Sequence, residues 1–321
     1  MEKILNYING ELVEPTSGNY LDNYNPSNGQ VYSLAPDSEE LDINNAVAAA
    51  KEAFNTWSKT PKQERSDILM KLADIIEKYS NELIKAESKD NGKPETLAAH
   101  VDIPRAPANI RFFAGAILHD SSQMHEMDGM AINYTLRQPV GVAACISPWN
   151  LPLYLLTWKI APALASGNTV VAKPSEVTPM TAFILSKICI EAGLPKGVLN
   201  IVHGLGSKIG DPLTTHPDTP IISFTGGTVT GKHIAAVTAP MFKKVSLELG
   251  GKNPNIIFAD ADFDKAVSAA ARAAFTNQGQ ICLCGSRLFI QEDIYEKFKI
   301  ALIEKTKKLQ VGDPKELSSN L

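Results

Sequence analysis

Short apolar runs alternate with longer helical stretches from Val140 onward, and this alternation constrains the fold more than any other feature of the chain. The runs are VGVAACI, NTVVAK, VLNIVHG, PIISFTG and KKVSLEL. One intervening helix is predicted to begin at Thr178-Pro179 and to end at Gly193, because Pro favours the first helical turn and Gly the position after the last. Continuous apolar strands joined by helices indicate a buried parallel sheet with helices on both faces. We therefore predict a doubly wound α/β domain that binds ligands beyond the carboxyl ends of its strands.

Two further segments flank this sheet in the sequence. The N-terminal stretch NYINGELVEP is predicted as a short hairpin followed by two helices, the second with an apolar face around Leu69, Leu72 and Ile76. After LELGGKNP a second αβ unit is predicted, with a helix over 262–275, the strand SRLFI, a helix over 293–309 and a final loop. We therefore predict one domain over residues 1–250 and the start of a second over 251–321.

The charge balance and the cysteine content exclude several classes of function. The 321 residues carry 31 Lys and Arg against 35 Asp and Glu, which is not the basic footprint that nucleic acids or anionic membranes require. No apolar run reaches the length of a transmembrane helix, and the N-terminus lacks the pattern of a secretory signal. The four cysteines form no CxxC pair, which argues against a disulfide framework or a metal site. We expect a soluble, cytoplasmic protein with reduced thiols.

Glycine-rich turns follow two of the predicted strands. In SFTGGTVTGKHIAAV a strand enters Gly226-Gly227 and a helix leaves, so the helix N-terminus would suit a phosphate. The stretch HGLGSKIG, with Gly206 and Gly210, is a second such turn, but its spacing is not GxGxxG. The stretch AKPSE places Lys173 and Glu176 at the same end of the sheet. They either hold the hydroxyls of a ribose or form a solvated loop pair.

Two polar side chains next to apolar strands each have two interpretations. The amide of Asn150, in SPWNLPLYLLTWKIAPAL, either caps the following helix or donates to a developing oxyanion. Glu248, in SLELGG, either pairs with Lys243 or Lys244, or stays unpaired in the apolar strand. In the second case desolvation would raise its pKa, as a general base near neutral pH requires.

Two of the four cysteines lie one residue apart in FTNQGQICLCGSR, residues 275–287. A free cysteine is usually a small buried apolar side chain. A turn rich in Gly, Gln and Asn between a helix and a strand can nevertheless expose a sulfur together with its own amide N–H. Alternation along ICLCGSRLFI places Cys282 and Cys284 on one side, so one of them must be explained by packing.

Four signatures resemble the NAD(P)-dependent aldehyde dehydrogenases: PWNLPLYLLTWKIAPALASGNTVVAKPSE, SFTGGTVTG, LELGGKNP and FTNQGQICLCGSR. The resemblance spans essentially the whole chain and implies a Rossmann-like NAD-binding domain over residues 1–250 and the N-terminal part of a catalytic domain over 251–321. It implies that Cys282 is the nucleophile and that Cys284 lines the pocket. It makes Glu248 the general base and Asn150 an oxyanion donor, for oxidation of an aldehyde through a thiohemiacetal and a thioester without a metal.

The same resemblance implies NAD as the cofactor. Lys173 and Glu176 would bind the adenosine ribose, and Gly226 and Gly227 would form the pyrophosphate turn. A carboxylate beside the ribose favours free hydroxyls over a 2′-phosphate, so Glu176 favours NAD over NADP. The full set of cofactor-binding residues implied is Ile146, Ser147, Pro148, Trp149, Lys173, Ser175, Glu176, Gly206, Gly210, Phe224, Gly226, Gly227 and Leu249.

The substrate is implied by AESKDNGKPETLAAHVDIPRAPANIRFFA together with the Asn150 and Cys282 segments. These stretches are similar to the 2-aminomuconic and 2-hydroxymuconic semialdehyde dehydrogenases, in which the arginine of DIPR, here Arg105, binds the distal carboxylate of the substrate. A guanidinium fits a carboxylate bidentately; the alternative is a surface Arg105 paired with Asp102. Arg111 is interpreted as structural. An apolar tunnel for the unsaturated chain would be walled by Leu151, Tyr154, Trp158 and Leu283. The alternative substrates are broad aliphatic or betaine-type aldehydes.

The family's chains are longer than this one, and its members form homo-oligomers, dimers or tetramers. A strand at about residues 131–139, within AINYTLRQPVG, is implied as part of the oligomerisation segment. We expect the chain to be a fragment or a truncated reading frame with compromised assembly. A catalytically silent NAD-binding fragment is the alternative to an active enzyme.

Overall fold

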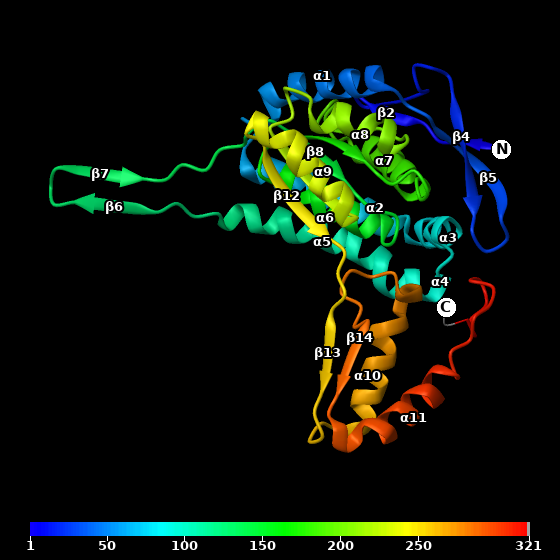
Figure 1. Cartoon of the computed structure of the whole chain (residues 1–321). Helices are drawn as coiled ribbons and strands as arrows, with labels where there is room; N and C mark the ends of the chain where they lie inside the picture. Colours follow the sequence, from blue (N-terminus) through cyan, green and yellow to red (C-terminus); the bar gives the residue numbers. More distant parts are fainter. Residues whose placement is uncertain (320–321) are drawn as a thin grey trace.

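The computed structural model describes residues 1–319. Its larger part is built on a seven-stranded sheet. A two-stranded ribbon projects from this larger part, and a smaller α/β unit is attached to it (Figure 1). No helix among residues 1–319 is long and apolar enough to cross a bilayer. The sheets and the helices that accompany them confirm the α/β architecture that the sequence predicts.

The main sheet has the strand order β12-β11-β8-β9-β10-β2-β3. Its parallel strands are β8 (Val142–Ile146), β9 (Thr169–Lys173), β10 (Leu199–Ile201), β11 (Ile221–Gly226) and β12 (Lys244–Leu249). Because β9 and β10 extend the sheet on one side of β8, and β11 and β12 on the other, the strand order reverses beside β8. Such a reversal opens a crevice at the carboxyl ends of the strands, where ligands bind.

The predicted N-terminal hairpin adds two antiparallel strands to this sheet. They are β2 (Asn6–Ile8) and β3 (Glu11–Val13), paired to each other and through β2 to β10. Asn9 and Gly10 form the turn with φ values of 52° and 78°. Two successive positive φ angles are typical of the tight turn that joins twisted antiparallel strands. The hairpin prediction is confirmed.

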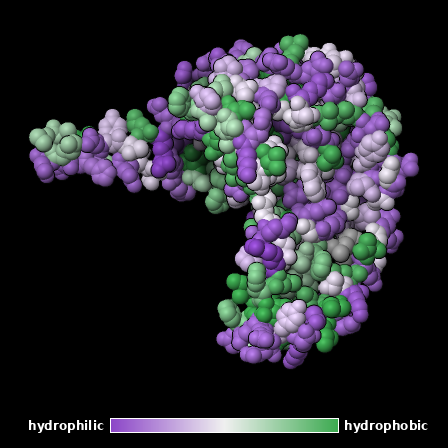
Figure 2. Space-filling view, viewed as in Figure 1, coloured by the Kyte–Doolittle hydropathy of each residue, from purple (hydrophilic) through white to green (hydrophobic). Residues whose placement is uncertain are grey.

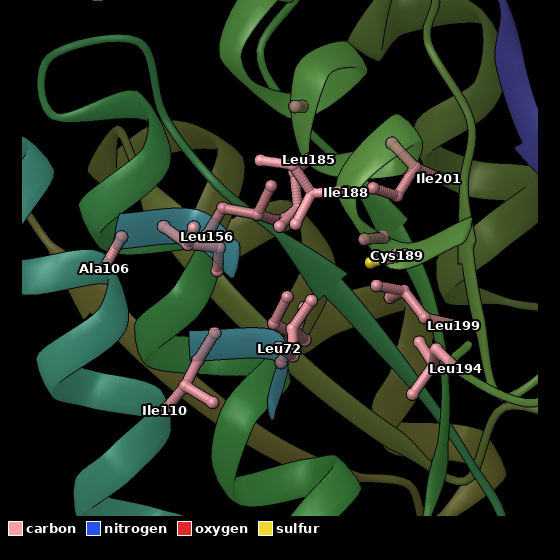
Figure 3. Close-up of a cluster of buried hydrophobic side chains, with 14 of the residues drawn as sticks. Leu72, Ala106, Ile110, Leu156, Leu185, Ile188, Cys189, Leu194, Leu199 and Ile201 are labelled. Atoms are coloured by element: carbon pink, nitrogen blue, oxygen red, sulfur yellow. The ribbon is translucent and has the colours of Figure 1, made fainter. Parts of the chain in front are cut away.

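Helices cover both faces of the central strands, as the buried apolar strands require. Side chains of β8 alternate: Val142 and Ala144 pack in one cluster with α1 (Glu40–Trp57) and α8 (Gly206–Thr214), whereas Ala143 and Cys145 pack in the other. The second cluster is formed with α2, α5, α6 and α7 and is shown in part in Figure 3. These helices span Lys62–Lys78, Ile103–Ala116, Pro152–Ala165 and Met180–Ala192.

The helix predicted from Thr178-Pro179 to Gly193 is present as α7, and Gly193 ends it with a φ of 72°. The region before α5 contains more elements than the sequence predicts. A separate sheet is formed by β1 (Glu2–Lys3), β5 (Gln30–Pro36) and β4 (Tyr20–Asn25). Between α2 and α5 lie three further helical segments, namely α3 (Ser80–Asn91), α4 (Glu95–Leu97) and a π-helical segment (Ala98–Asp102).

Strand β12 is not buried as its apolar sequence KKVSLEL predicts. It lies at the edge of the sheet beside β11, and its even-numbered residues are exposed while its odd-numbered residues are half-buried. Helix α9 (Thr228–Thr238) contacts it. The prediction of helices over both faces is therefore wrong for this strand, because alternation at a sheet edge depends on which neighbours cover it.

The projecting ribbon consists of β6 (Met124–Met127) and β7 (Ala131–Tyr134), and all of its residues are exposed. It extends from the end of α5 away from the rest of the chain (Figures 1 and 2). The predicted strand at about 131–139 is thus shorter than expected. Its antiparallel partner β6 was not predicted, since MHEM has no strand pattern of its own.

The smaller unit pairs β13 (Pro254–Ile257) with β14 (Arg287–Ile290) in parallel and packs them on α10 (Phe263–Phe275) and α11 (Tyr295–Thr306). The helix predicted over 262–275 is present, and Asp262 caps it by accepting from the Lys265 amide at 3.2 Å. The helix predicted over 293–309 is shorter than expected. The final loop returns to the main body, where the Glu95 amide donates to the Pro314 carbonyl at 2.9 Å.

Candidate active site

A cavity of about 720 Å³ lies at the carboxyl ends of β8, β9 and β11. It occupies the crevice that the strand order predicts. Apart from Leu249, every residue that the sequence assigns to the cofactor lines it. The strand prediction and the resemblance therefore lead to the same place in the structure.

The turn between β11 and α9 forms one wall of this cavity. Gly227 is the N-cap of α9, so the unpaired amides of the helix N-terminus lie at the cavity, where they favour an anion. A Cβ on Gly226 would lie 2.4 Å from Cζ of Phe224, which also lines the cavity. Only glycine therefore fits at this position without displacing the aromatic ring.

Lys173 and Glu176 form an ion pair on the other wall. Nζ of Lys173 lies 2.9 Å from Oε2 of Glu176, and the lysine is 3% exposed. Burial lowers the pKa of Lys173, while the Glu176 carboxylate opposes this shift. The interpretation as a solvated loop pair is wrong, because the ammonium is buried; the pair is a fixed hydrogen-bonding group at the cavity wall.

A second cavity of about 610 Å³ adjoins the first and shares Pro148, Trp149 and the Gly226-Gly227 turn with it. Its remaining lining includes Asn150, Leu249, Gln280 and Cys282. The two cavities together lead from the Lys173–Glu176 pair to the sulfur of Cys282. An elongated ligand bound in the first would reach toward the thiol in the second.

The two neighbouring cysteines differ sharply in their surroundings. Cys282 is exposed, whereas Cys284 is 8% exposed and does not line the second cavity. The prediction that they share one side is wrong, because residues 282–283 form a turn and the strand begins only at Arg287. Cys145 and Cys189 are buried, which raises the pKa of each thiol to about 12. Cys282 is therefore the cysteine best placed to react.

The segment before Cys282 has an unusual backbone. Asn277, Gln278 and Gly279 have φ values of 53°, 54° and 73°, and positive φ is costly for the two residues with a Cβ. The side-chain Nδ2 of Asn253 donates to the Cys282 carbonyl at 2.6 Å and to the Cys284 carbonyl at 3.2 Å. The Asn253 side chain thus holds the loop that presents the thiol in a conformation with two costly positive φ angles.

Asn150 does not cap the helix that follows it. The N-cap of α6 is Leu151, without a side-chain cap, so the capping interpretation is wrong. Nδ2 of Asn150 instead donates to the Gln280 carbonyl at 2.8 Å. The Asn150 amide therefore points at the loop of Cys282, as an oxyanion donor must.

Glu248 matches one of its two interpretations only in part: it lies unpaired in its strand, but the strand does not bury it. It is exposed on β12, so the expectation of a desolvated carboxylate is wrong. Lys243 donates to the His216 carbonyl and to Oγ1 of Thr219, and within residues 1–319 the structure shows no ion pair of Glu248 with Lys243 or Lys244. Glu248 precedes Leu249, which lines the second cavity with Cys282.

Arg105 contacts Tyr154 instead of Asp102. One guanidinium nitrogen donates to the Tyr154 hydroxyl at 3.3 Å, and the group lies 5.2 Å from the ring centroid. Asp102 is buried and pairs with Lys93, so the surface-pair alternative is wrong. Arg111 has the structural role expected of it, with ion pairs to Asp74 and Glu77.

The predicted apolar tunnel is not enclosed within residues 1–319. Tyr154 and Trp158 form an edge-to-face pair with centroids 6.4 Å apart. Trp158 is 44% and Leu283 80% exposed, whereas Leu151 is only 6% exposed. Leu151 is therefore buried, whereas Trp158 and Leu283 are open to solvent.

Comparison with known proteins decides between families that share this architecture. The model of the aldehyde dehydrogenase family matches residues 12–321. The chain belongs to the aldehyde dehydrogenase family. It is similar to the NAD⁺ complex of an aldehyde dehydrogenase from Bacillus cereus, with a TM-score of 0.98 and 40% identity over 100% of this chain and 66% of that one.

Among curated family members, it is 53% identical to the 2-aminomuconic semialdehyde dehydrogenase of Danio rerio over 98% of this chain. It is 44% identical to the 2-hydroxymuconic semialdehyde dehydrogenase of Pseudomonas sp. strain CF600 over 100% of this chain. The chain spans 64% and 67% of the lengths of these two aldehyde dehydrogenases.

Several residues of this aldehyde dehydrogenase site were not predicted from the sequence. Asn277 is 1% exposed, and its amide donates to the carbonyls of Asn150 and Gln280 at 3.0 and 3.3 Å. No local pattern indicates that contact. The helix residues of the first cavity could have been found, because they recur one turn apart on α8 and α9 beside the predicted glycines. They are Ser207, Asp211, Thr214, Val229, Thr230, His233 and Ile234.

Proposed function

We propose that this chain carries the NAD-dependent oxidation of a semialdehyde to a carboxylic acid, with Cys282 as the nucleophile. The observation that carries the proposal is the pair of adjoining cavities that joins the α9 N-terminus to the exposed thiol. The names of the similar semialdehyde dehydrogenases support the substrate class, and the NAD⁺ complex of the Bacillus cereus relative supports the cofactor.

The residues of the first cavity fit a dinucleotide. The amides at the start of α9 would hold the pyrophosphate, and the Lys173–Glu176 pair would bind the ribose hydroxyls. The buried hydroxyl of Ser147 lines the cavity and has no partner in residues 1–319, so it can bind a ligand. The Glu176 carboxylate would repel a 2′-phosphate, which favours NAD over NADP. When bound, NAD supplies the hydride acceptor.

The residues of the second cavity would act on the aldehyde in turn. The Cys282 thiolate adds to the carbonyl carbon, and the new oxyanion accepts hydrogen bonds from the Cys282 amide and from Asn150. The Nδ2 group of Asn150 has two N–H bonds, and one of them is used on Gln280. Loss of hydride from the same carbon restores a carbonyl as a thioester. Water then releases the acid, and the family resemblance assigns the proton of that water to Glu248, which precedes Leu249 of the second cavity.

We assign the distal carboxylate of the substrate to Arg105. Its guanidinium is held over the Tyr154 ring, and its planar fork suits a carboxylate. Arg105→Ala should raise KM for a carboxylate-bearing semialdehyde about 10-fold or more with a smaller effect on kcat. An unchanged KM would favour an aldehyde without a distal carboxylate.

The ribbon β6–β7 is our candidate for assembly with a second copy of the chain. It projects from the body (Figure 1), and its exposed residues include Met124, Ile132 and Tyr134. We also assign the two α/β units to the predicted domains, residues 1–250 for NAD and 251–321 for part of the catalytic domain. Strand β12 ends at Leu249 and β13 begins at Pro254, which agrees with that boundary.

The test of the proposed function is NADH formation by the purified chain with 2-hydroxymuconic semialdehyde, with Cys282→Ser and Cys284→Ser measured beside it. We expect turnover to be lost in Cys282→Ser and retained in Cys284→Ser, because Cys282 lines the second cavity and Cys284 does not. Stabilisation by NAD without any turnover would instead show a cofactor-binding protein that does not catalyse the oxidation.

A further inference from the structure

A charged cluster with no exposure to solvent lies next to the segment that carries Asn150. It consists of Lys93, Glu87 and Asp102, each of which is 0% exposed. Nζ of Lys93 donates to Oδ2 of Asp102 and lies 3.6 Å from Oε1 of Glu87. Because a buried ammonium without partners is very unfavourable, the carboxyl groups of Asp102 and Glu87 hold the lysine in one position.

One further hydrogen bond joins this cluster to the site. Nζ of Lys93 donates to the main-chain carbonyl of Asn150 at 3.1 Å. Nδ2 of Asn277, which belongs to the segment before Cys282, donates to the same carbonyl at 3.0 Å. Two donors on one carbonyl oxygen fix the peptide plane, and the peptide plane sets the direction in which the Asn150 side chain leaves the backbone.

We propose that Lys93 is a positioning residue that aims the Asn150 amide at the oxyanion formed on Cys282. The inference rests on the proposed function, in which Asn150 is the oxyanion donor. Lys93 lines neither cavity, so it acts through the Asn150 backbone. Misplacing a donor by about 1 Å can cost a reaction roughly 10²-fold, so a single buried contact is enough to matter.

The charge of the cluster supports an effect through geometry. Burial raises the pKa of Glu87 to about 8, with Lys93 opposing the shift, and burial also raises the pKa of Asp102. Near neutral pH Glu87 is therefore mostly protonated. The Lys93–Asp102 contact then holds Nζ of Lys93 beside the Asn150 carbonyl.

Two reagents separate oxyanion positioning from thiol reactivity. With p-nitrophenyl acetate, the Cys282 thiolate adds to the ester carbonyl, passes through an oxyanion and expels p-nitrophenolate to leave a thioester. With iodoacetamide, the same thiolate displaces iodide at a tetrahedral carbon without forming an oxyanion. Neither reaction needs NAD. The variant is Lys93→Met, which keeps the length of the side chain and removes its N–H donors.

The matched control is Arg65→Met. Arg65 is also buried, at 5% exposure, and donates to main-chain carbonyls, that of Ala165 at 3.0 Å and that of Thr60, but it lines neither cavity. We expect Lys93→Met to slow acylation by about 10-fold or more while alkylation stays within about 2-fold. Arg65→Met should leave both rates within about 2-fold. Circular dichroism shows whether each variant is folded.

Three results would overturn the inference. Acylation of Lys93→Met at the wild-type rate, or an equal fall in acylation and alkylation, removes the positioning role and leaves the proposed function in place. Alkylation of wild-type Cys282 without any acylation overturns the proposed function and the inference with it. If Lys93→Met does not fold, Asp102→Asn, which keeps the ammonium and removes the carboxylate that holds it, is judged by the same two rates.

Discussion

The protonation of Glu87 should be visible in the stability of the whole chain. Burial raises its pKa to about 8 from an ordinary value of 4.5, and the charged groups facing it are Lys93, Asp102 and Asp90. A carboxyl whose pKa is higher in the folded state binds its proton more tightly there. Its stabilising effect is complete below about pH 4.5 and is lost as the pH rises through 8.

Glu87→Gln keeps the neutral form at every pH, so its melting temperature should fall less than that of the wild type between pH 6 and 9. We expect a gap of roughly 3 °C or more at the upper end. Differential scanning calorimetry at a series of pH values measures it. Glu82→Gln, on the same helix but exposed, is the control, and equal slopes for Glu87→Gln and the wild type would contradict the prediction.

At the residue scale, the positions of the motif residues agree with a common site, whereas environments that burial decides were not predicted. Cys282 and Asn150 were predicted from their motifs, and the structure places both on one cavity. The contacts that fix Asn150 come from residues 57 and 127 positions away. Long-range contacts of this kind leave no local pattern in the sequence, and the exposure of Glu248 depends on which elements cover its strand.

At the scale of elements, the junction of β11 and α9 is the most sensitive point of the cofactor cavity. Gly226→Ala would place its Cβ 2.4 Å from the ring of Phe224, which is 5% exposed and lines the cavity. The ring must move, so we expect NAD affinity to fall about 10-fold or more and the melting temperature to drop.

Titration calorimetry with NAD and thermal unfolding measure these two effects. Gly115→Ala is the matched control, because a Cβ on Gly115, within α5, meets nothing within 4 Å. It should leave NAD affinity unchanged and stabilise the chain slightly, since alanine favours a helix. Unchanged affinity and stability in Gly226→Ala would contradict the account of this junction.

Elements with a strong local pattern were predicted well. The five parallel strands, α7 and the N-terminal hairpin follow from apolar runs and from turn residues. The π-helical segment before α5, the sheet of β1, β5 and β4, and the ribbon strand β6 have no such pattern, because their stability depends on packing or on a partner strand. The edge position of β12 was missed because apolar composition does not specify the order of strands in a sheet.

At the scale of the whole molecule, the projecting ribbon is the surface through which we propose that copies associate. Met124, Glu126, Ile132 and Tyr134 share one face of it, since Met124 pairs with Tyr134 and Glu126 with Ile132. A ribbon that exposes apolar side chains is expected to pair with or pack on another chain. The combined replacement Ile132→Glu with Tyr134→Glu should therefore lower the molar mass in solution toward that of the monomer.

Light scattering during size-exclusion chromatography gives the mass, and Asn133→Glu, which changes the other face of the same strand, is the control. An equal mass for both variants and the wild type would exclude the apolar face as the contact. The smaller unit also exposes apolar residues, Ile256, Phe258 and Phe289 among them (Figure 2). The sequence could predict two α/β units, but not which of their faces lie open.

The most direct test of the central claim is the rate at which iodoacetamide modifies Cys282 with saturating NAD or with saturating AMP, read by peptide mass analysis. In the proposed complex the adenosine half of the cofactor lies near Lys173 and Glu176, and the nicotinamide half lies in the cavity that Cys282 lines. NAD should therefore change the modification rate by about 5-fold or more, while AMP leaves it within about 2-fold. Equal effects of the two ligands, or no effect of either at saturation, would contradict the account.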